Sequence, residues 1–214
     1  MSGFEQAEYL VQKLREILAT PLPGSEAQTR MAPSVRSDLL GNSAPNAQTR
    51  RSAVLIMLYP KNGTLYFPLI KRQTYDGPHS GQISLPGGKF EEGDETLHHT
   101  ALRESYEEIG VDTSKIEVLG ELSLLYIPVS NLCVKPVVGY LANTPTFLPN
   151  LQEVEYIIEA PLEHLTMEQY KSVKVITSHG RPVTAPYYNL CGEMVWGATA
   201  MILSEFEELL RRSL

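Results

Sequence analysis

The chain is short of several residue types, and each shortage argues against a class of protein. Its 214 residues include two cysteines and one tryptophan, so a small scaffold held together by disulfides is excluded. Lysine and arginine number 18 against 25 acidic residues, which gives a formal charge of −7. This balance disfavours non-specific binding to nucleic acid or to anionic membranes, because such binding needs a positive surface. A polyanionic substrate is still permitted, since a bound metal and a few local cations reverse the charge within a site.

Long apolar runs are also lacking. The longest one, residues 53–59, is too short to cross a bilayer. Glu5 and Glu8 stand where a secretory signal would be apolar, which favours a cytoplasmic protein without a membrane span. Cys133 and Cys191 lie in apolar stretches, and we expect two reduced, buried thiols. With 43% hydrophobic residues, the chain can bury a core as one domain with extensions.

Apolar periodicity divides the chain near residue 50. Residues 4–19 repeat apolar side chains at helical spacing, whereas residues 21–50 are rich in Pro, Ser, Asn and Gly without a sustained period. We therefore expect a helix and an extended arm at 1–50, followed by a compact domain at 51–214.

The compact part mixes β-type runs with a few helical ones. Strands are expected at 53–59, 64–71, 116–126, 132–140, 153–159, 173–177 and 183–189, and helices at 94–109 and 198–211. Lys61-Asn62-Gly63 predicts a hairpin between the first two strands. Because no regular alternation of strand and helix appears, the pattern predicts an α+β or sandwich fold.

Three glutamates in the expected helix at 94–109 indicate a metal site. Glu104, Glu107 and Glu108 are spaced i, i+3 and i+4, which places all three on one helix face. Like charges this close repel, and a hard cation such as Mg²⁺ or Mn²⁺ removes the conflict by taking carboxylate oxygens as ligands. Just upstream, Gly87-Gly88 lets the backbone approach a phosphate closely. Together these features predict metal-assisted attack on a phosphoryl group.

The segment around these glutamates resembles the Nudix box, G-x5-E-x7-R-E-U-x-E-E-x-G-U, in which U is a bulky apolar residue. Ser105 stands where an apolar residue is usual. Gly88 lies one residue further from Glu95 than in the pattern, so either the loop holds an extra residue or Asp94 takes the acidic role. The matching positions are Glu95, Arg103-Glu104, Glu107-Glu108, Gly110 and Val111. The resemblance implies an α/β/α sandwich with a mixed β-sheet, and hydrolysis of a nucleoside diphosphate linked to another moiety.

A narrower resemblance lies upstream. Leu69-Ile70-Lys71-Arg72 and Gly81–Gly88 are similar to the signature L-L-T-x-R…G-Q-I-S-F-P-G-G, which marks Nudix hydrolases acting on coenzyme A. Leu85 replaces the phenylalanine, and Gly77 stands where the signature has a second arginine. Downstream, residues 128–139 and 196–200 also look like that subgroup. This resemblance implies cleavage of coenzyme A to 4′-phosphopantetheine and adenosine 3′,5′-bisphosphate.

The roles expected of single residues follow from this chemistry. Glu104, Glu107 and Glu108 would hold Mg²⁺ or Mn²⁺, and Glu104 is the first candidate for the base that deprotonates water. Arg103 would orient a glutamate through a bidentate pair. Glu153 is a second candidate for the base, and the alternative for it is a solvent-facing charge on a strand. Glu95 is expected to cap the helix or to bind Arg103, and a role at the metal is the alternative for it. The residues expected at the substrate are Arg72, Gly87, Gly88 and Lys89.

Two other functions stay open on the sequence. One is hydrolysis of another nucleotide diphosphate, such as ADP-ribose or NADH, because of Gly77 and the unmatched residues 21–50. The other is nucleotide sensing without catalysis, although domains of that kind typically lose box glutamates. The expected partner is a small nucleotide diphosphate. The resemblance also implies a homodimer, in which the 4–19 helix either serves the interface or packs on its own chain.

Overall fold

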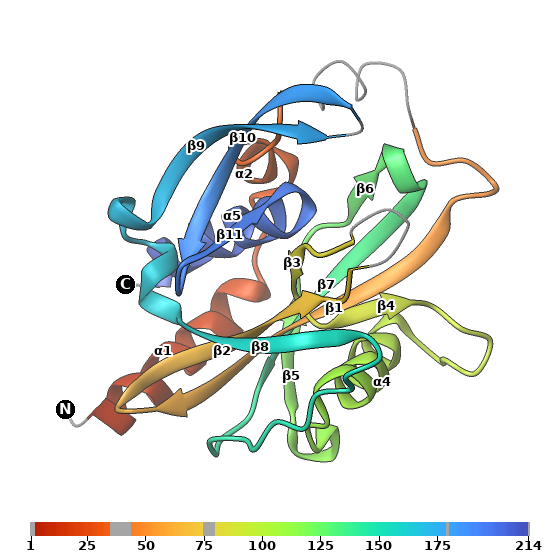
Figure 1. Ribbon diagram of the computed structural model, residues 1–214. Coiled ribbons are helices and arrows are strands. Elements are labelled where there is room, and N and C mark those ends of the chain that lie inside the picture. The colour runs from red at the N-terminus through yellow and green to blue at the C-terminus, as the bar shows by residue number, and fades with distance from the viewer. Residues whose placement is uncertain (1–2, 35–43, 75–79, 179, 214) are drawn as a thin grey trace.

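The computed structural model describes residues 3–34, 44–74, 80–178 and 180–213 (Figure 1). Its main sheet has the order β3-β2-β1-β7-β5, with β4 on β1, β6 on β7 and β8 on β2. The strands are β1 (Arg50–Lys61), β2 (Thr64–Arg72), β3 (Ile83–Ser84), β4 (Gly87–Lys89), β5 (Glu117–Glu121), β6 (Leu125–Ile127), β7 (Leu132–Tyr140) and β8 (Val154–Pro161). The sheet is mixed, as predicted, because β1 and β7 run parallel while the other pairs are antiparallel.

The predicted hairpin between the first two strands is present. Asn62 and Gly63 have positive φ angles of 52° and 79°, the backbone that a two-residue hairpin turn requires. Beyond this turn β1 pairs with β2 only from Tyr59 to Lys61, whereas its first residues pair with β4. On this side of β1, β4 therefore pairs with the first half of the strand and β2 with its end. We call β4 the glycine strand.

Helices cover both faces of the main sheet. The long helices are α1 (Gly3–Leu18), α4 (Leu97–Ile109) and α5 (Gly197–Ser213). Successive side chains of β1 alternate between two cores, as strand geometry dictates. Leu55 and Met57 belong to the core that includes Ala101 and Ile109 of α4. Ile56 and Leu58 belong to the core that includes residues of α1 and α5. The α+β sandwich with helices on both sides of a mixed sheet is thus confirmed (Figure 1).

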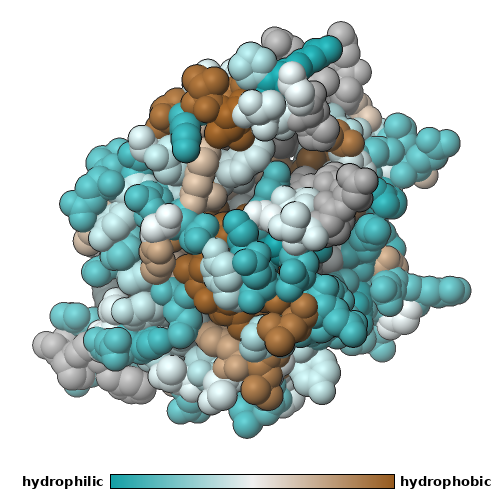
Figure 2. All heavy atoms as spheres, in the orientation of Figure 1, coloured by the Kyte–Doolittle hydropathy of each residue, from teal (hydrophilic) through white to brown (hydrophobic). Residues whose placement is uncertain are grey.

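A second, three-stranded sheet lies over α2 and α5 in Figure 1. It consists of β9 (Lys171–Ser178), β10 (Arg181–Leu190) and β11 (Glu193–Trp196), in the order β11-β10-β9. Strands were expected at 173–177 and 183–189, which correspond to β9 and β10, whereas no strand was expected at β11. Figure 2 shows apolar side chains on this sheet, where Val173 and Val175 of β9 are 61% and 64% exposed.

Short elements link these layers. They are η1 (Thr113–Lys115), η2 (Pro128–Ser130), η3 (Leu162–Leu165) and η4 (Glu168–Tyr170). The strand expected at 116–126 is interrupted, because β5 ends at Glu121 and Leu122 donates its backbone N–H to Pro136 O before β6 begins. None of the helices in the described part of the chain has the length and apolar character needed to span a bilayer.

The N-terminal arm differs from the prediction. Residues 21–50 were expected to be extended, but Gly24–Thr29 form the short helix α2. Pro21 and Pro23 end the preceding helix, yet they do not prevent a new one from starting. The backbone N–H of Gly24 donates to Glu205 Oε1 at 3.0 Å, and Ala27 is fully buried. Tertiary packing on α5 therefore makes a helix where the sequence carries no periodic signal. Residues 35–43 of the arm lie outside the described residues.

The prediction of two buried thiols is wrong in one respect. Both cysteines are free, as expected, but Cys133 is half-buried and Cys191 is exposed. Cys191 occupies the turn between β10 and β11, with a φ of 54°. Its apolar neighbours in sequence belong to the adjoining strands, which is why the local pattern suggested burial.

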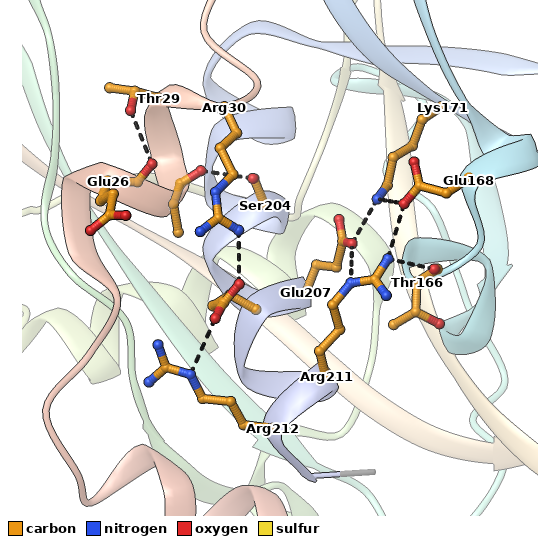
Figure 3. A network of polar contacts seen from close by, with 12 residues as sticks. Glu26, Thr29, Arg30, Thr166, Glu168, Lys171, Ser204, Glu207, Arg211 and Arg212 are labelled. Carbon is orange, nitrogen blue, oxygen red and sulfur yellow. Dashed lines mark hydrogen bonds and ion pairs between the residues drawn. The ribbon is translucent and has the colours of Figure 1, made fainter.

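A network of ion pairs holds α5 to the second sheet (Figure 3). Glu207, which is 7% exposed, accepts hydrogen bonds from Lys171 Nζ at 2.7 Å and Arg211 Nε at 2.8 Å. The hydroxyl of Tyr188 also donates to Glu207, at 2.7 Å. The second sheet is therefore fixed to the helix by charge as well as by apolar packing.

Candidate active site

Helix α4 carries the three glutamates, and its ends are set by local sequence. Thr96 is the N-cap, since its side chain accepts a hydrogen bond from His99 N, and Gly110 ends the helix with a φ of 66°. Both are residue types that favour these positions. The helix starts at Leu97 rather than at Asp94, so Asp94 and Glu95 lie in the preceding turn. Glu95 is therefore not the N-cap of the helix.

Glu108 is the most buried of the three carboxylates, at 1% exposure. Its Oε2 accepts a hydrogen bond from Gly87 N at 2.8 Å, and its Oε1 lies 3.4 Å from Arg72 Nη1. Burial raises the pKa of Glu108 to about 8, because the hydrogen bond from Gly87 and the charge of Arg72 offset only part of the lost hydration. The neighbouring charges of Glu104 and Glu153 raise this pKa further. Glu108 is thus a carboxylate that lacks enough positive partners to be fully ionised at neutral pH.

Glu104 lies directly against Gly88. A Cβ atom built on Gly88 would come within 2.4 Å of Cδ and both carboxylate oxygens of Glu104, so only glycine fits while the carboxylate stays in place. Burial also raises the pKa of Glu104, with Arg103 opposing the shift and Glu107 and Glu153 adding to it. The helix therefore places a second carboxylate against the glycine strand, and the positive charge near this carboxylate does not fully balance it.

The backbone of β4 is held close to β1. Gly87 has a φ of 150°, and a Cβ atom there would lie 2.3 Å from Ala53 O. Gly88 O accepts a hydrogen bond from Ser52 Oγ at 2.6 Å. The two glycines predicted at the substrate thus have separate structural reasons: Gly87 permits the approach to β1, and Gly88 leaves room for Glu104.

Arg103 has a different partner from the one expected. Its bidentate pair is with Asp94, with Nε–Oδ1 at 2.9 Å and Nη2–Oδ2 at 3.0 Å, and not with a glutamate. Asp94 is 6% exposed and also accepts from Thr100 Oγ1 at 2.8 Å, and its pKa is held well below the usual range, chiefly by Arg103. Asp94 rather than Glu95 therefore takes the acidic role, consistent with its position six residues after Gly88. The prediction that Glu95 binds Arg103 or caps the helix is wrong.

While paired with Asp94, Arg103 also makes one contact with each of two glutamates. Its Nη1 lies 3.1 Å from Glu104 Oε1 and 3.1 Å from Glu107 Oε2, and its Nη2 donates to Lys89 O at 3.0 Å. Arg103 therefore ties the beginning of the helix, the glycine strand and two carboxylates together.

Glu107 is the outermost of the three, with its side chain 48% exposed. Within the described ranges, no group of three His, Cys, Asp or Glu side chains is gathered closely enough to hold a metal ion. The donor set nevertheless suits a hard cation, because the buried Glu108 and the half-buried Glu104 have partners that do not balance their charge. Metal ligation by the three glutamates stays a prediction.

The remaining predicted residues lie around this centre. Arg72 ends β2, and its Nε is buried with no hydrogen-bond partner among the described residues. Lys89 is exposed at the end of β4. Glu153 is exposed just before β8, and its backbone O accepts a hydrogen bond from Gln73 N at 3.0 Å. The negative charge of Glu153 contributes to the raised pKa values of Glu104 and Glu108. Gly77 and the neighbouring His79 lie outside the described residues.

A cavity of about 410 Å³ opens beside the glycine strand. Arg72, Gly87, Gly88 and Lys89, which the sequence predicts at the substrate, all line it. Other lining residues come from segments far apart in the chain: Arg50, Ser52, Val54, Gln82, Ser84, Leu85, Ile127, Ser130, Leu132, Val134, Trp196, Ala198, Thr199 and Ile202. Many of these lie in segments that resemble the coenzyme A subgroup, namely residues 81–88, 128–139 and 196–200. Sequence reasoning missed the others, which are Arg50, Ser52, Val54, Ile127 and Ile202.

The fold and this glycine–glutamate centre define a Nudix-type domain. A family model described as the NUDIX domain matches residues 49–172. The chain therefore belongs to the Nudix hydrolase family.

Curated relatives agree with this assignment. "Nudix hydrolase 15, mitochondrial" of Arabidopsis thaliana is 38% identical over 161 residues, covering 72% of this chain and 56% of the relative. "Nudix hydrolase 22, chloroplastic" of the same plant is 36% identical, covering 72% and 53%. "Uncharacterized Nudix hydrolase NudL" of Yersinia pestis is 34% identical, covering 74% and 78%. The chain thus spans about half the length of the two plant relatives.

Solved structures support the fold. A Nudix hydrolase of M. smegmatis, RenU, has a TM-score of 0.53 at 14% identity, covering 80% of this chain and 92% of that one. A MutT/nudix family protein of Enterococcus faecalis has a TM-score of 0.53 at 16% identity, covering 90% and 76%. At these identities the likeness shows a shared fold alone.

Proposed function

We propose that this chain hydrolyses the diphosphate bond of coenzyme A or its derivatives, giving 4′-phosphopantetheine and adenosine 3′,5′-bisphosphate. Nudix enzymes generally use divalent metal ions, and for this chain we infer Mg²⁺ or Mn²⁺. The observation that carries the proposal is a pair of carboxylates next to the glycine strand, the buried Glu108 and the half-buried Glu104, whose pKa values are raised. A bound cation would balance the negative charge of these carboxylates and would also attract an anionic substrate.

Coenzyme A as the substrate is supported by where its signature falls in the fold. Arg72 from the first half of the signature lines one cavity together with four members of the second half, Gln82, Ser84, Gly87 and Gly88. Residues that are separated in sequence thus border a single space next to the glutamates. This arrangement is what a substrate-binding role of the signature residues requires.

The residues of the chain divide the work of hydrolysis. Glu104, Glu107 and Glu108 would hold the metal, and such an ion, when bound, neutralises diphosphate charge and lowers the pKa of a bound water. Glu104 is the first candidate for the base, because burial raises its pKa and so increases its affinity for a proton. Glu153 is the second candidate, and its exposure leaves it free to approach a bound substrate.

Cationic residues would place the phosphates. Arg72 has an unpaired, buried Nε among its described contacts and only a 3.4 Å approach to Glu108, so it retains donors for a phosphate oxygen. Lys89 offers an exposed ammonium group at the same cavity. Arg103 acts as a positioning residue, since Asp94 fixes it and it contacts Glu104 and Glu107.

The surrounding organisation is also inferred. We take residues 51–214 as the hydrolase domain and residues 1–50 as a support, although α1 contributes Val11 and Leu14 to the same core. A homodimer and a cytoplasmic location stay predictions, and the two plant relatives carry mitochondrial and chloroplastic names.

A substrate panel tests the proposal. Coenzyme A, acetyl-coenzyme A, dephospho-coenzyme A, ADP-ribose and NADH are each incubated with the protein and Mg²⁺ or Mn²⁺, and the products are separated by chromatography. The highest kcat/KM is expected for coenzyme A or its acyl derivative. A higher kcat/KM for ADP-ribose or NADH would contradict the substrate, and binding without turnover of any compound would favour nucleotide sensing.

A further inference from the structure

The cavity beside the glycine strand is lined by two chemically different sets of residues. Three are cationic: Arg72, which lies 3.4 Å from Glu108, Lys89 on β4, and Arg50 at the start of β1. Apolar residues make up much of the rest: Val54, Leu85, Ile127, Leu132, Val134, Trp196, Ala198 and Ile202. Its volume of about 410 Å³ lies within the range of small-molecule sites, about 300–1,000 Å³. In a chain of net charge −7, three cations at the edge of an apolar cavity indicate an anionic ligand with an apolar extension.

Two hydroxyl groups in the wall of this cavity have no partner. Ser84 Oγ and Ser130 Oγ are buried and make no hydrogen bond to any described residue. Both residues line the cavity from different sides of the fold, Ser84 on β3 and Ser130 on η2. A buried, unsatisfied hydroxyl is unfavourable and needs an explanation, and a ligand with polar groups supplies one.

The segment carrying Ser130 is held in place at the cavity edge. Arg50 Nη2 donates to Ser130 O at 3.0 Å, and the next residue, Asn131, accepts from Thr49 Oγ1 at 2.7 Å. Across the cavity, Thr199 Oγ1 lies 3.4 Å from Ile83 O, next to Ser84. The backbone that carries the two hydroxyls is therefore held in place by hydrogen bonds of neighbouring groups, which favours binding of a defined chain of polar and apolar groups.

We propose that this cavity binds the uncharged arm of the substrate, a flexible chain of methylene and amide groups attached to one phosphate of the diphosphate. The proposal rests on the proposed function and specifies which half of the substrate the cavity takes. Amide groups would pair with the hydroxyls of Ser84 and Ser130, and methylene groups would contact the apolar wall. A nucleobase fits less well, because base recognition relies on stacking and Trp196 is the single aromatic side chain among the lining residues. Ser84, Ser130 and Ala198 are accordingly specificity-determining positions.

Filling the cavity tests this assignment. Ala198→Phe places a ring in the apolar part, and the matched control Ala142→Phe adds the same ring at an exposed alanine outside the lining. Both are assayed with coenzyme A and with an armless analogue, the methyl ester of 3′-phosphoadenosine diphosphate. For Ala198→Phe the KM of coenzyme A should rise by about tenfold or more, while the KM of the analogue changes much less. Equal losses with both substrates in a variant of unchanged thermal midpoint, or no loss with either, would overturn the proposal.

Removing one hydroxyl gives a second, milder test. Ser130→Ala should raise the KM of coenzyme A by about three- to tenfold, the effect of one hydrogen bond, and leave the analogue unaffected. Its thermal midpoint should stay the same or rise, because the hydroxyl has no partner in the free protein. A lower midpoint together with an unchanged KM would mean that Ser130 stabilises the fold and does not contact the uncharged arm of the substrate.

Failure of the proposed function is distinguishable from failure of this inference. If the wild-type chain hydrolyses neither compound, the enzymatic proposal is wrong, and the cavity is judged by calorimetric titration with coenzyme A. Binding that weakens about tenfold in Ala198→Phe would still support the cavity assignment. Equal affinity of the wild type and the variant, or no binding to either, would reject it.

Discussion

Two pairs of glutamates in this molecule, all largely shielded from solvent, have opposite surroundings. On α5, Glu205 accepts hydrogen bonds from Gly24 N, Gln28 Nε2 and Ser123 N, at 3.0, 2.8 and 3.2 Å. Glu207 on the same helix accepts from the cationic side chains of Lys171 and Arg211 (Figure 3), and also from the hydroxyl of Tyr188. On α4, Glu108 has one short hydrogen bond and one arginine at 3.4 Å, and Glu104 has one arginine at 3.1 Å.

The difference teaches how to tell a structural carboxylate from a functional one in the same fold. A buried carboxylate is tolerated when several donors replace its hydration, and the pair on α5 meets this requirement while joining α2 and the second sheet to the helix. The pair on α4 does not, so its pKa values are raised. Burial alone therefore does not identify the site, but burial with too few donors does.

The largest expected effect separates the two pairs by activity. Glu108→Gln should lower kcat/KM by about 10³-fold, because it removes a negative ligand and the charge that the ion requires. Glu207→Gln on α5 should keep kcat/KM within about threefold, because it lies outside the site. Steady-state hydrolysis assays on both purified variants make the comparison. Similar losses in the two variants would show that donor count does not mark function here.

The reverse order is expected for stability. Glu207→Ala should lower the free energy of unfolding by about 3 kcal/mol, because it leaves Lys171 and Arg211 short of a buried anion. Glu208→Ala, the matched control on the same helix, removes more exposed ion pairs and should cost no more than about 1 kcal/mol. Denaturant unfolding measures both. A control as destabilised as Glu207→Ala would assign the effect to the helix rather than to the network.

A smaller loss should follow from one added methyl group at the glycine strand. Gly88→Ala places a Cβ atom against the Glu104 carboxylate and forces it to move. A displacement of this size should lower kcat by about 10²-fold. The variant should fold, since a flexible side chain rather than backbone takes the clash, and circular dichroism checks this. Wild-type kcat in a folded Gly88→Ala protein would mean that the position of Glu104 is unimportant.

The smallest effect is a dependence of stability on pH in protein freed of metal by a chelator. The pKa of Glu108 is about 8 in the folded chain, above its unfolded value, so the folded state binds more protons between these two values. Stability should therefore be highest below the unfolded pKa and fall as pH rises toward 8, by at most about 1.4 kcal/mol per pH unit for this one group. Glu108→Gln should flatten this fall, as unfolding midpoints at pH 5, 6.5 and 8 would show. Parallel curves for the two proteins would remove Glu108 as the cause.

Sequence patterns predicted the elements whose signals are local. The turn at Asn62-Gly63, the strand Leu132–Tyr140 and the end of α4 at Gly110 follow from residues within a few positions of each feature. Helix α2 and the exposed Cys191 did not follow, because the first depends on contacts with Glu205, 181 positions from Gly24, and the second on a turn between two strands.

The site was predictable to a similar extent. The box placed Glu104, Glu107 and Glu108 on one helix face, but the choice between Asp94 and Glu95 as partner of Arg103 required the conformation of the turn before α4. The cavity walls formed by η2 and the start of α5 lie in segments that resemble the coenzyme A subgroup, but no pattern in the sequence places these segments beside the glycine strand. They become neighbours of that strand only when the chain folds, so their place in the cavity required the structure.

Titration with Mn²⁺ is the most direct test of the claim that the under-compensated glutamates form a metal site. Calorimetry at pH 7 would compare the wild type, Glu108→Gln and Glu207→Gln. The wild type and Glu207→Gln should bind Mn²⁺ with release of protons, because Glu108 is largely protonated below its pKa of about 8. Glu108→Gln should bind at least about tenfold more weakly and release fewer protons. Equal affinity in all three proteins, or no binding to the wild type, would contradict the account.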